Sequence, residues 1–153
     1  MADPATGFIA NLLTGLAVYI AAAPSIGATW SPSAAYTSAQ TAIVLGTLPA
    51  NPDRLITLTA YDALDDPTAA RSIIPVQIRT RWGTTDPRYV YNLDDALFVL
   101  LHNLSSVTLS TGVYVGQIHR NSGPAPPVQD QNQRWSLSSN YYVTCWRPGV
   151  NRL

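Results

Sequence analysis

The chain has 153 residues, of which 46% are hydrophobic and 12% are charged, and its formal net charge is zero. All nine basic residues are arginine and all nine acidic residues are aspartate. This composition excludes a disordered tail, and the absence of a basic excess argues against general electrostatic binding of nucleic acid. The length suits one domain with a substantial core, so we expect a single domain over residues 1–153.

The first predicted element is an amphipathic helix near residues 4–23, with Asp3 as N-cap and Pro4 at the first helical position. Its apolar stripe consists of Ile9, Leu12, Leu13, Leu16, Tyr19 and Ile20, and the opposite side consists of Asn11, Thr14 and Ala17. No basic segment precedes the apolar run, which is also short for a membrane span. We therefore expect a helix that docks on the domain, not a signal peptide or a membrane anchor.

Two β-prone runs, residues 42–49 and 54–61, follow a Pro- and Ser-rich segment. The Asn-Pro-Asp of residues 51–53 predicts a turn between them, and strands joined by short turns favour antiparallel pairing. Residues 62–70 have the sequence DALDDPTAA and are expected to form an exposed acidic connection that is mobile in the isolated chain.

Residues 71–83, RSIIPVQIRTRWG, have the clearest strand pattern of the chain. Ile74, Val76 and Ile78 fall on one face of such a strand, because successive side chains point to opposite sides of a sheet. The polar side chains of Gln77, Arg79 and Arg81 fall on the other face, which we expect to be uncovered. That face contacts either solvent or a protein partner.

A second amphipathic helix is predicted over residues 87–104, after the helix-start signature Asp86-Pro87. Its stripe consists of Val90, Leu93, Leu97, Leu100, Leu101 and Leu104. Adjacent helical residues do not share a face, so Asp94 and Asp95 are expected to be solvated and to make a poor acid–base pair.

The rest of the chain is predicted to form a strand at 113–120, a proline-studded polar loop that is mobile in the isolated chain, and a strand at 134–146. Cys145 is the only cysteine and alternates in phase with Val143, so we interpret it as a small buried apolar residue. The order of elements predicts an α+β fold: a two-layer sandwich of a mainly antiparallel sheet with two amphipathic helices on one face.

Motifs of common enzymes and cofactor sites are not found in the sequence. It contains no G-x-S-x-G, Walker loop, dinucleotide fingerprint or H-E-x-x-H. His102 and His119 have no carboxylate at metal-ligand spacing, and Asp65 and Asp66 lack a third oxygen ligand at useful spacing. We therefore expect no catalytic activity, no cofactor and no metal.

Several short motifs occur in a characteristic order along the chain. They are Pro52-Asp53-Arg54 with Tyr61, then Val76, Gln77, Arg79 and Arg81, then Asp130, Arg134 and Asn140. In the order and spacing of these residues, over nearly its whole length, the chain resembles the tail terminator (minor capsid, tail completion) family of long-tailed bacteriophages. It departs from the family pattern in a longer Ala- and Ser-rich segment after the first helix. It also has Gln133 where a glycine often precedes the arginine.

The resemblance implies a small α+β virion protein, made in the host cytoplasm, that forms a hexameric ring at the head-proximal end of the tail. Such a ring caps the tail tube, ends tube polymerisation and presents a joining surface to the head–tail connector protein. DNA passes through the ring without sequence-specific binding, and no membrane is involved. Another head–tail connector or tail tube protein of similar fold and an unrecognised small enzyme are the alternatives.

Under this resemblance, Gln77, Arg79 and Arg81 are predicted to meet a neighbouring ring subunit or the tail tube protein, because arginine forms bidentate contacts with carboxylates and is enriched at interfaces. The predicted partners are the aspartates of the acidic connection: Asp62, Asp65 and Asp66. Asp65 and Asp66 are also candidates for the lining of the ring's hole, where negative charge would keep DNA from adhering.

Overall fold

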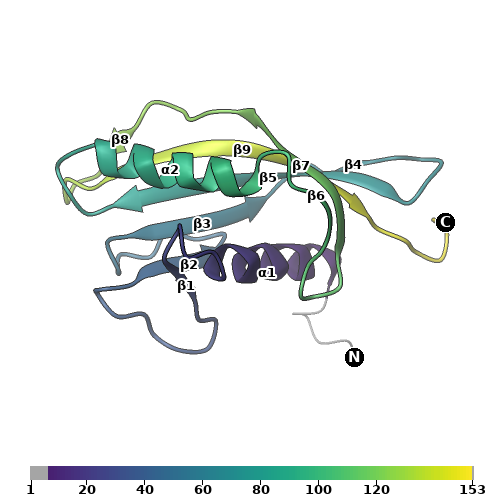
Figure 1. Ribbon diagram of the computed structural model, residues 1–153, viewed down its shortest axis with the longest axis horizontal. Helices are drawn as coiled ribbons and strands as arrows, with labels where there is room; N and C mark the ends of the chain where they lie inside the picture. Colours follow the sequence, from purple (N-terminus) through teal and green to yellow (C-terminus); the bar gives the residue numbers. More distant parts are fainter. Residues whose placement is uncertain (1–6, 153) are drawn as a thin grey trace.

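The computed structural model describes residues 7–152, which form an α+β fold with a curled mixed sheet (Figure 1). The helices of this part are α1 (Phe8–Ala21) and α2 (Arg88–Leu101). The strands are β1 (Ala28–Trp30), β2 (Thr41–Leu45), β3 (Leu55–Ala60), β4 (Leu64–Asp65), β5 (Arg71–Trp82), β6 (Ser105–Thr108), β7 (Tyr114–Ser122), β8 (Val128–Gln129) and β9 (Trp135–Trp146).

The two long strands, β5 and β9, form the centre of the sheet. They pair antiparallel over their whole lengths, from Arg71 opposite Trp146 to Trp82 opposite Trp135. The strand order is β1-β2-β3-β5-β9-β7-β6, with β4 also paired to β5 and β8 to β9. The pairs β1–β2 and β2–β3 are parallel, and the other pairings of the described strands are antiparallel.

The antiparallel pairing expected for residues 42–49 and 54–61 is wrong. Strands β2 and β3 run parallel, with Ala42 opposite Leu55. Residues 46–54 do not reverse the chain as a tight turn but return it to the starting end of β2, where the amide of Ala42 donates to the carbonyl of Arg54 at 3.1 Å. A parallel pair requires such a returning connection. Backbone carbonyls of this connection accept hydrogen bonds from the side chains of Arg81 and Arg134.

Both helices contribute to one continuous hydrophobic cluster. Helix α1 contacts β1, β2 and β3, whereas α2 contacts β5, β7 and β9 (Figure 1). The cluster takes alternate residues of the strands, as the period of two predicts; they include Ile56, Leu58, Ile74, Val76, Ile78, Tyr141, Val143 and Cys145. From the helices it takes Leu12, Leu16, Ala17, Ile20, Leu93, Leu97 and Leu101.

The first helix is buried more widely than its sequence stripe predicts. Ala17 is buried although the sequence pattern places it opposite the stripe, and Gly15 is buried as well. The turn before β7 covers this side, because the hydroxyl of Thr111 donates to the carbonyl of Asn11 at 2.6 Å. Gly7 occupies the N-cap position of the described helix. The predicted N-cap Asp3 and first helical residue Pro4 lie outside the described residues.

Three connections contain more structure than expected. The acidic segment 62–70 includes β4, which pairs with β5 as a hairpin. The proline-studded loop includes β8, and β6 precedes β7. Helix α2 begins at Arg88, one residue later than expected, and the carboxylate of Asp86 still accepts the amide of Arg88 at 3.0 Å. Neither described helix is long and apolar enough to cross a membrane.

Candidate functional site

The side chains of Gln77 and Arg79 of β5 lie on the sheet face opposite α2. Ile78 and Thr80 are buried on the α2 side, so Gln77 and Arg79 project the other way. Together with Thr57, Thr59 and residues 46–48, they line an open hollow of about 180 Å³. We call this surface the Arg79 face. The guanidinium of Arg79 donates to the hydroxyl of Ser136 at 3.1 Å.

Arg81 does not share this exposure, and the expectation that it would lie on an uncovered face is wrong. Its side chain is folded under the returning loop, and the residue is only 5% exposed. Its Nε donates to the carbonyl of Asp53 at 2.9 Å, and Nη2 donates to the carbonyls of Pro49 and Pro52, each at 2.7 Å. Burial, followed by the nearby charge of Arg134, lowers the pKa of Arg81. Arg81 therefore holds the loop that returns β2 to β3.

Arg134 holds the same loop from the other side. Its Nη1 donates to the carbonyl of Ala50 at 2.5 Å and pairs with the carboxylate of Asp53 at 3.3 Å, while Nε donates to Asp130 at 2.8 Å. Burial acts to raise the pKa of Asp130, but the hydrogen bonds from the backbone and side chain of Arg134 outweigh it, so the pKa is lowered. We call Arg81, Arg134, Asp53 and Asp130 the arginine cluster.

Gln133, which stands where the family pattern often has a glycine, has an unusual backbone conformation. Gln133 has a φ of +61°, in the left-handed region that glycine adopts without strain. Its amide donates to the carbonyl of Asp130 at 3.0 Å, which closes the turn that aims Arg134 at the loop. This left-handed backbone conformation explains why the family pattern often has a glycine at this position.

The remaining motif residues form separate contacts. The hydroxyl of Tyr61 donates to Asn140 Oδ1 at 3.2 Å, and the side-chain amide of Asn140 donates to Ser122 at 3.1 Å. These bonds join the residue that follows β3 to β9, and β9 to β7, on the Arg79 face. Arg54 donates to the carbonyl of Ala39 and lies over the ring of Trp82, at 5.2 Å from its centroid. The motif residues thus fix loops and neighbouring strands to one another.

Two of the three aspartates predicted as interface partners bind residues of their own hairpin. Asp65 accepts the hydroxyl of Ser72 at 2.5 Å, and Asp66 accepts the amide and hydroxyl of Thr68, each at 2.8 Å. The bonds from Thr68 are the main cause of the lowered pKa of Asp66. Asp62 is exposed and has no ion pair within the described residues.

The sequence interpretation misses a buried carboxylate. Asp94 is 1% exposed, not solvated, and accepts the hydroxyl of Ser139 at 2.7 Å. Arg120 pairs with its other oxygen at 3.3 Å. Burial raises the pKa of Asp94, against the opposing effects of Ser139 and Arg120. The burial of Asp94 could have been predicted from its spacing, because it lies four residues after Val90 and three before Leu97, in line with the apolar stripe.

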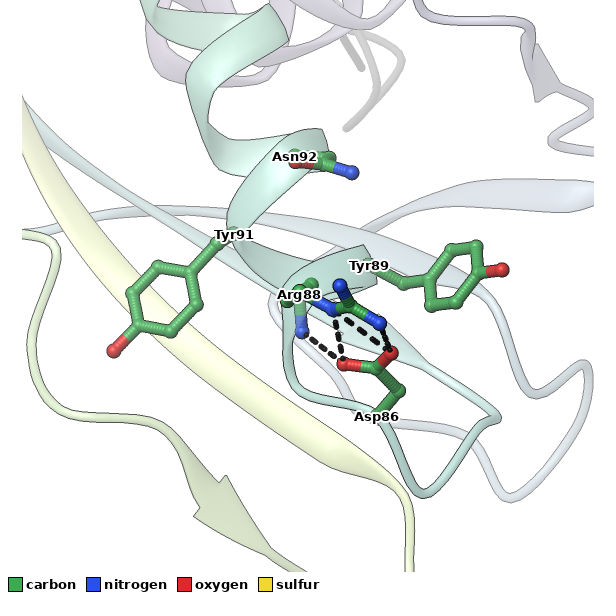
Figure 2. A pocket seen from close by; sticks show the side chains of 5 residues that line it. All are labelled: Asp86, Arg88, Tyr89, Tyr91 and Asn92. Atoms are coloured by element: carbon green, nitrogen blue, oxygen red, sulfur yellow. Dashed lines mark hydrogen bonds and ion pairs between the residues drawn. The ribbon is translucent and has the colours of Figure 1, made fainter.

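A larger hollow of about 350 Å³ lies at the start of α2. Figure 2 shows Tyr89 and Tyr91 pointing to different sides of the helix, with Asp86 and Arg88 bonded to each other between them. The ion pair measures 2.7 Å and is exposed, and it lowers the pKa of Asp86 through the hydrogen bonds of Arg88. The charged groups of this hollow are thus already engaged with one another.

Reactive groups are few in the described part of the chain. Cys145 is 2% exposed, as expected for a buried apolar residue, and burial raises the pKa of its thiol to about 12. A thiol with this pKa stays protonated at neutral pH and is a poor nucleophile. Among residues 7–152, no group of three or more His, Cys, Asp or Glu side chains is placed to hold a metal ion.

Comparison with known protein families indicates the same family as the order of the sequence motifs. The model of the bacteriophage tail terminator protein family matches residues 24–145, which include every motif residue named above. No protein of curated function matches the sequence. The matched range covers β5, β9 as far as Cys145, the returning loop and the arginine cluster. The chain therefore belongs to the bacteriophage tail terminator protein family and has a structural role in the phage tail.

Proposed function

We propose that this protein forms a ring, hexameric as the family resemblance implies, that caps the finished tail tube. In this role it ends tube polymerisation and offers the surface to which the head–tail connector protein binds, at the head-proximal end of the tail. The observation that carries the proposal is the family match over residues 24–145. The protein works by binding other proteins, and no catalytic step enters the proposal.

The proposed subunit has two layers, with both helices on one face of the sheet. The shared hydrophobic cluster of α1 and α2 supports this arrangement. It leaves the Arg79 face for a neighbouring subunit or the tail tube protein, with Gln77 and Arg79 as direct contacts. Arg81 contributes indirectly, because it positions the loop whose residues 46–48 border that face.

Charge supports the proposed passage of DNA through the ring. The chain has a formal net charge of zero and no lysine, so it lacks the basic excess that binds phosphates through counterion release. The proposal that Asp65 and Asp66 line the hole rests on the same argument. Their bonds to Ser72 and Thr68 would hold these carboxylates in place in such a lining.

The test is to delete the gene from the phage and to label the protein in particles that carry a tagged copy. Deletion should yield heads without attached tails and tubes of uncontrolled length, and the label should appear once per tail, at the head-proximal end. A label repeated along the tail would identify a tube protein instead. A label at the end, with normal tube length after deletion, would identify a connector that does not end polymerisation.

A further inference from the structure

The charged side chains of the described chain are almost all engaged within the subunit. Six aspartates form ion pairs: Asp53, Asp65, Asp66, Asp86, Asp94 and Asp130. Two described aspartates, Asp62 and Asp95, are exposed and have no ion pair within residues 7–152. These two carboxylates are therefore free to bind a cation on another molecule.

Arg79 has hydrogen-bonding capacity left over beside an open hollow. A guanidinium has five N–H donors, and within the described residues Arg79 makes one side-chain hydrogen bond, to Ser136. Its Nε is shielded from solvent and has no partner among the described residues. Gln77, Thr57 and Thr59 surround it in the hollow of the Arg79 face, with no carboxylate in the lining. The hollow is thus suited to a carboxylate from outside the subunit.

Asp95 lies on the opposite side of the molecule. Helix α2 packs on β5 and β9 (Figure 1). Its buried side chains include Leu93, Asp94 and Leu97, so the helical spacing directs Asp95 away from the sheet. One turn further along the same helix face, Val99 is 81% exposed. The hollow of the Arg79 face offers a matching apolar group, because Leu48 on its border is 43% exposed. Both the charge and the apolar neighbour of Asp95 therefore have counterparts beside Arg79.

We propose that Asp95 on the outer face of α2 binds Arg79 of the next copy of the chain, with Val99 against Leu48. This inference rests on the proposed ring and identifies the surfaces that would join its subunits. The two surfaces differ, so the contact between copies is heterologous. Each open oligomer then has one free surface of each kind at its ends, and it closes into a ring when the rotation between neighbouring copies permits. Asp62 is the competing partner. It directly follows Tyr61, which lies on the Arg79 face, so pairing with Asp62 would join like surfaces as a two-fold dimer.

The test uses charge reversal in two separate proteins, Arg79→Asp and Asp95→Arg. In a heterologous contact each variant alone brings like charges together and should lose assembly. An equimolar mixture should recover it, because the aspartate introduced in one variant would meet the arginine introduced in the other, and the original Arg79 would meet the original Asp95. A ring with an even number of subunits can alternate the two variants without a mismatch. Assembly is measured by light scattering after size exclusion, and the circular dichroism melt of each variant establishes that it is folded.

Asp62→Arg is the matched control, since it reverses the other free carboxylate and should assemble like the wild type. The same variants are expressed singly and together in cells infected with phage that lacks the gene, and infectious particles are counted. This second readout applies even when the free protein is monomeric. Normal assembly or particle yield with Asp95→Arg alone would overturn the inference, as would failure of the mixture when both variants are folded. Rescue of Arg79→Asp by Asp62→Arg would establish the two-fold contact instead. A wild-type gene that restores neither tail length nor head attachment would contradict the proposed function itself.

Discussion

Arg81 and Arg134 both donate a hydrogen bond to the carbonyl oxygen of Ala50, at 3.5 and 2.5 Å. Two like charges around one acceptor repel each other, and the carboxylates of Asp53 and Asp130 beside Arg134 offset that repulsion. The bonds run from β5 and from the residue before β9 to a loop between β2 and β3. The position of this loop, and the parallel pairing that depends on it, is therefore set by distant side chains and not by its own turn residues.

Replacing Arg81 should destabilise the fold far more than replacing its neighbour Arg79. Arg81→Ala leaves the carbonyls of Pro49 and Pro52 without a charged donor and should lower the free energy of unfolding by roughly 2–4 kcal/mol. Arg81→Lys should fall between the wild type and alanine, because an ammonium group lacks the planar fork. Arg79→Ala is the control and should cost under about 1 kcal/mol. Urea unfolding measures all three, and equal costs at the two positions would contradict the loop-holding role.

The buried carboxylate of Asp94 should give stability a distinctive pH dependence. Burial raises its pKa above 3.8, so the folded state binds this proton more tightly than the unfolded state. The stabilising contribution of Asp94 is then complete below about pH 3.8 and is lost as the pH rises through the raised pKa. Asp94→Asn, which retains an acceptor for Ser139, removes this titration. The wild-type minus variant difference in unfolding free energy should fall with rising pH and then level off. A difference that grows with pH would mean that Arg120 lowers the pKa of Asp94 by more than burial raises it.

Helix α2 should depend on one leucine and tolerate change at its outer face. Leu97 is fully buried, and Leu97→Ala should cost roughly 2–5 kcal/mol. Val99 is 81% exposed, so Val99→Ala should change stability by less than about 0.5 kcal/mol. Thermal unfolding at concentrations where the chain is monomeric compares the two. A small cost at Leu97 would mean that the helix does not pack on β5 and β9 as described.

Periodicity in the sequence predicted the long elements well. The alternation of Ile74, Val76 and Ile78 identified β5 and its buried face, and helical spacing identified α2. These patterns depend only on which residues are apolar and on the geometry of each element. The pairing of β2 with β3 could not be predicted in this way. It depends on hydrogen bonds from Arg81 and Arg134, which are distant in the sequence from the loop they hold.

The same limit applies to the candidate site. Arg79 and Arg81 occupy equivalent positions in the alternating pattern, yet one borders an open hollow and the other is buried beneath a loop. The difference arises from residues 46–54, which cover one end of the face and not the other. The burial of Asp94 could have been predicted from the sequence, since its spacing from Val90 and Leu97 placed it on the buried stripe.

Gly15 should resist substitution even though alanine is the better helix former. A Cβ at this position would lie 2.8 Å from Leu109 Cβ and 2.8 Å from the hydroxyl of Thr111, which is itself bonded to the carbonyl of Asn11. Alanine gains about 1 kcal/mol in helix propensity, whereas overpacking costs about 1–3 kcal/mol. Because Leu109 Cβ is tied to the backbone and Thr111 is fixed by its bond, we expect Gly15→Ala to lower stability by about 1 kcal/mol. Thr14→Ala, one residue earlier in the same helix, gains the propensity without the close contacts and should be neutral or slightly stabilising. Thermal melts of the two variants decide the matter: if Gly15→Ala stabilises the protein as much as Thr14→Ala does, the turn at residues 109–112 moves away freely and does not lock α1 in place.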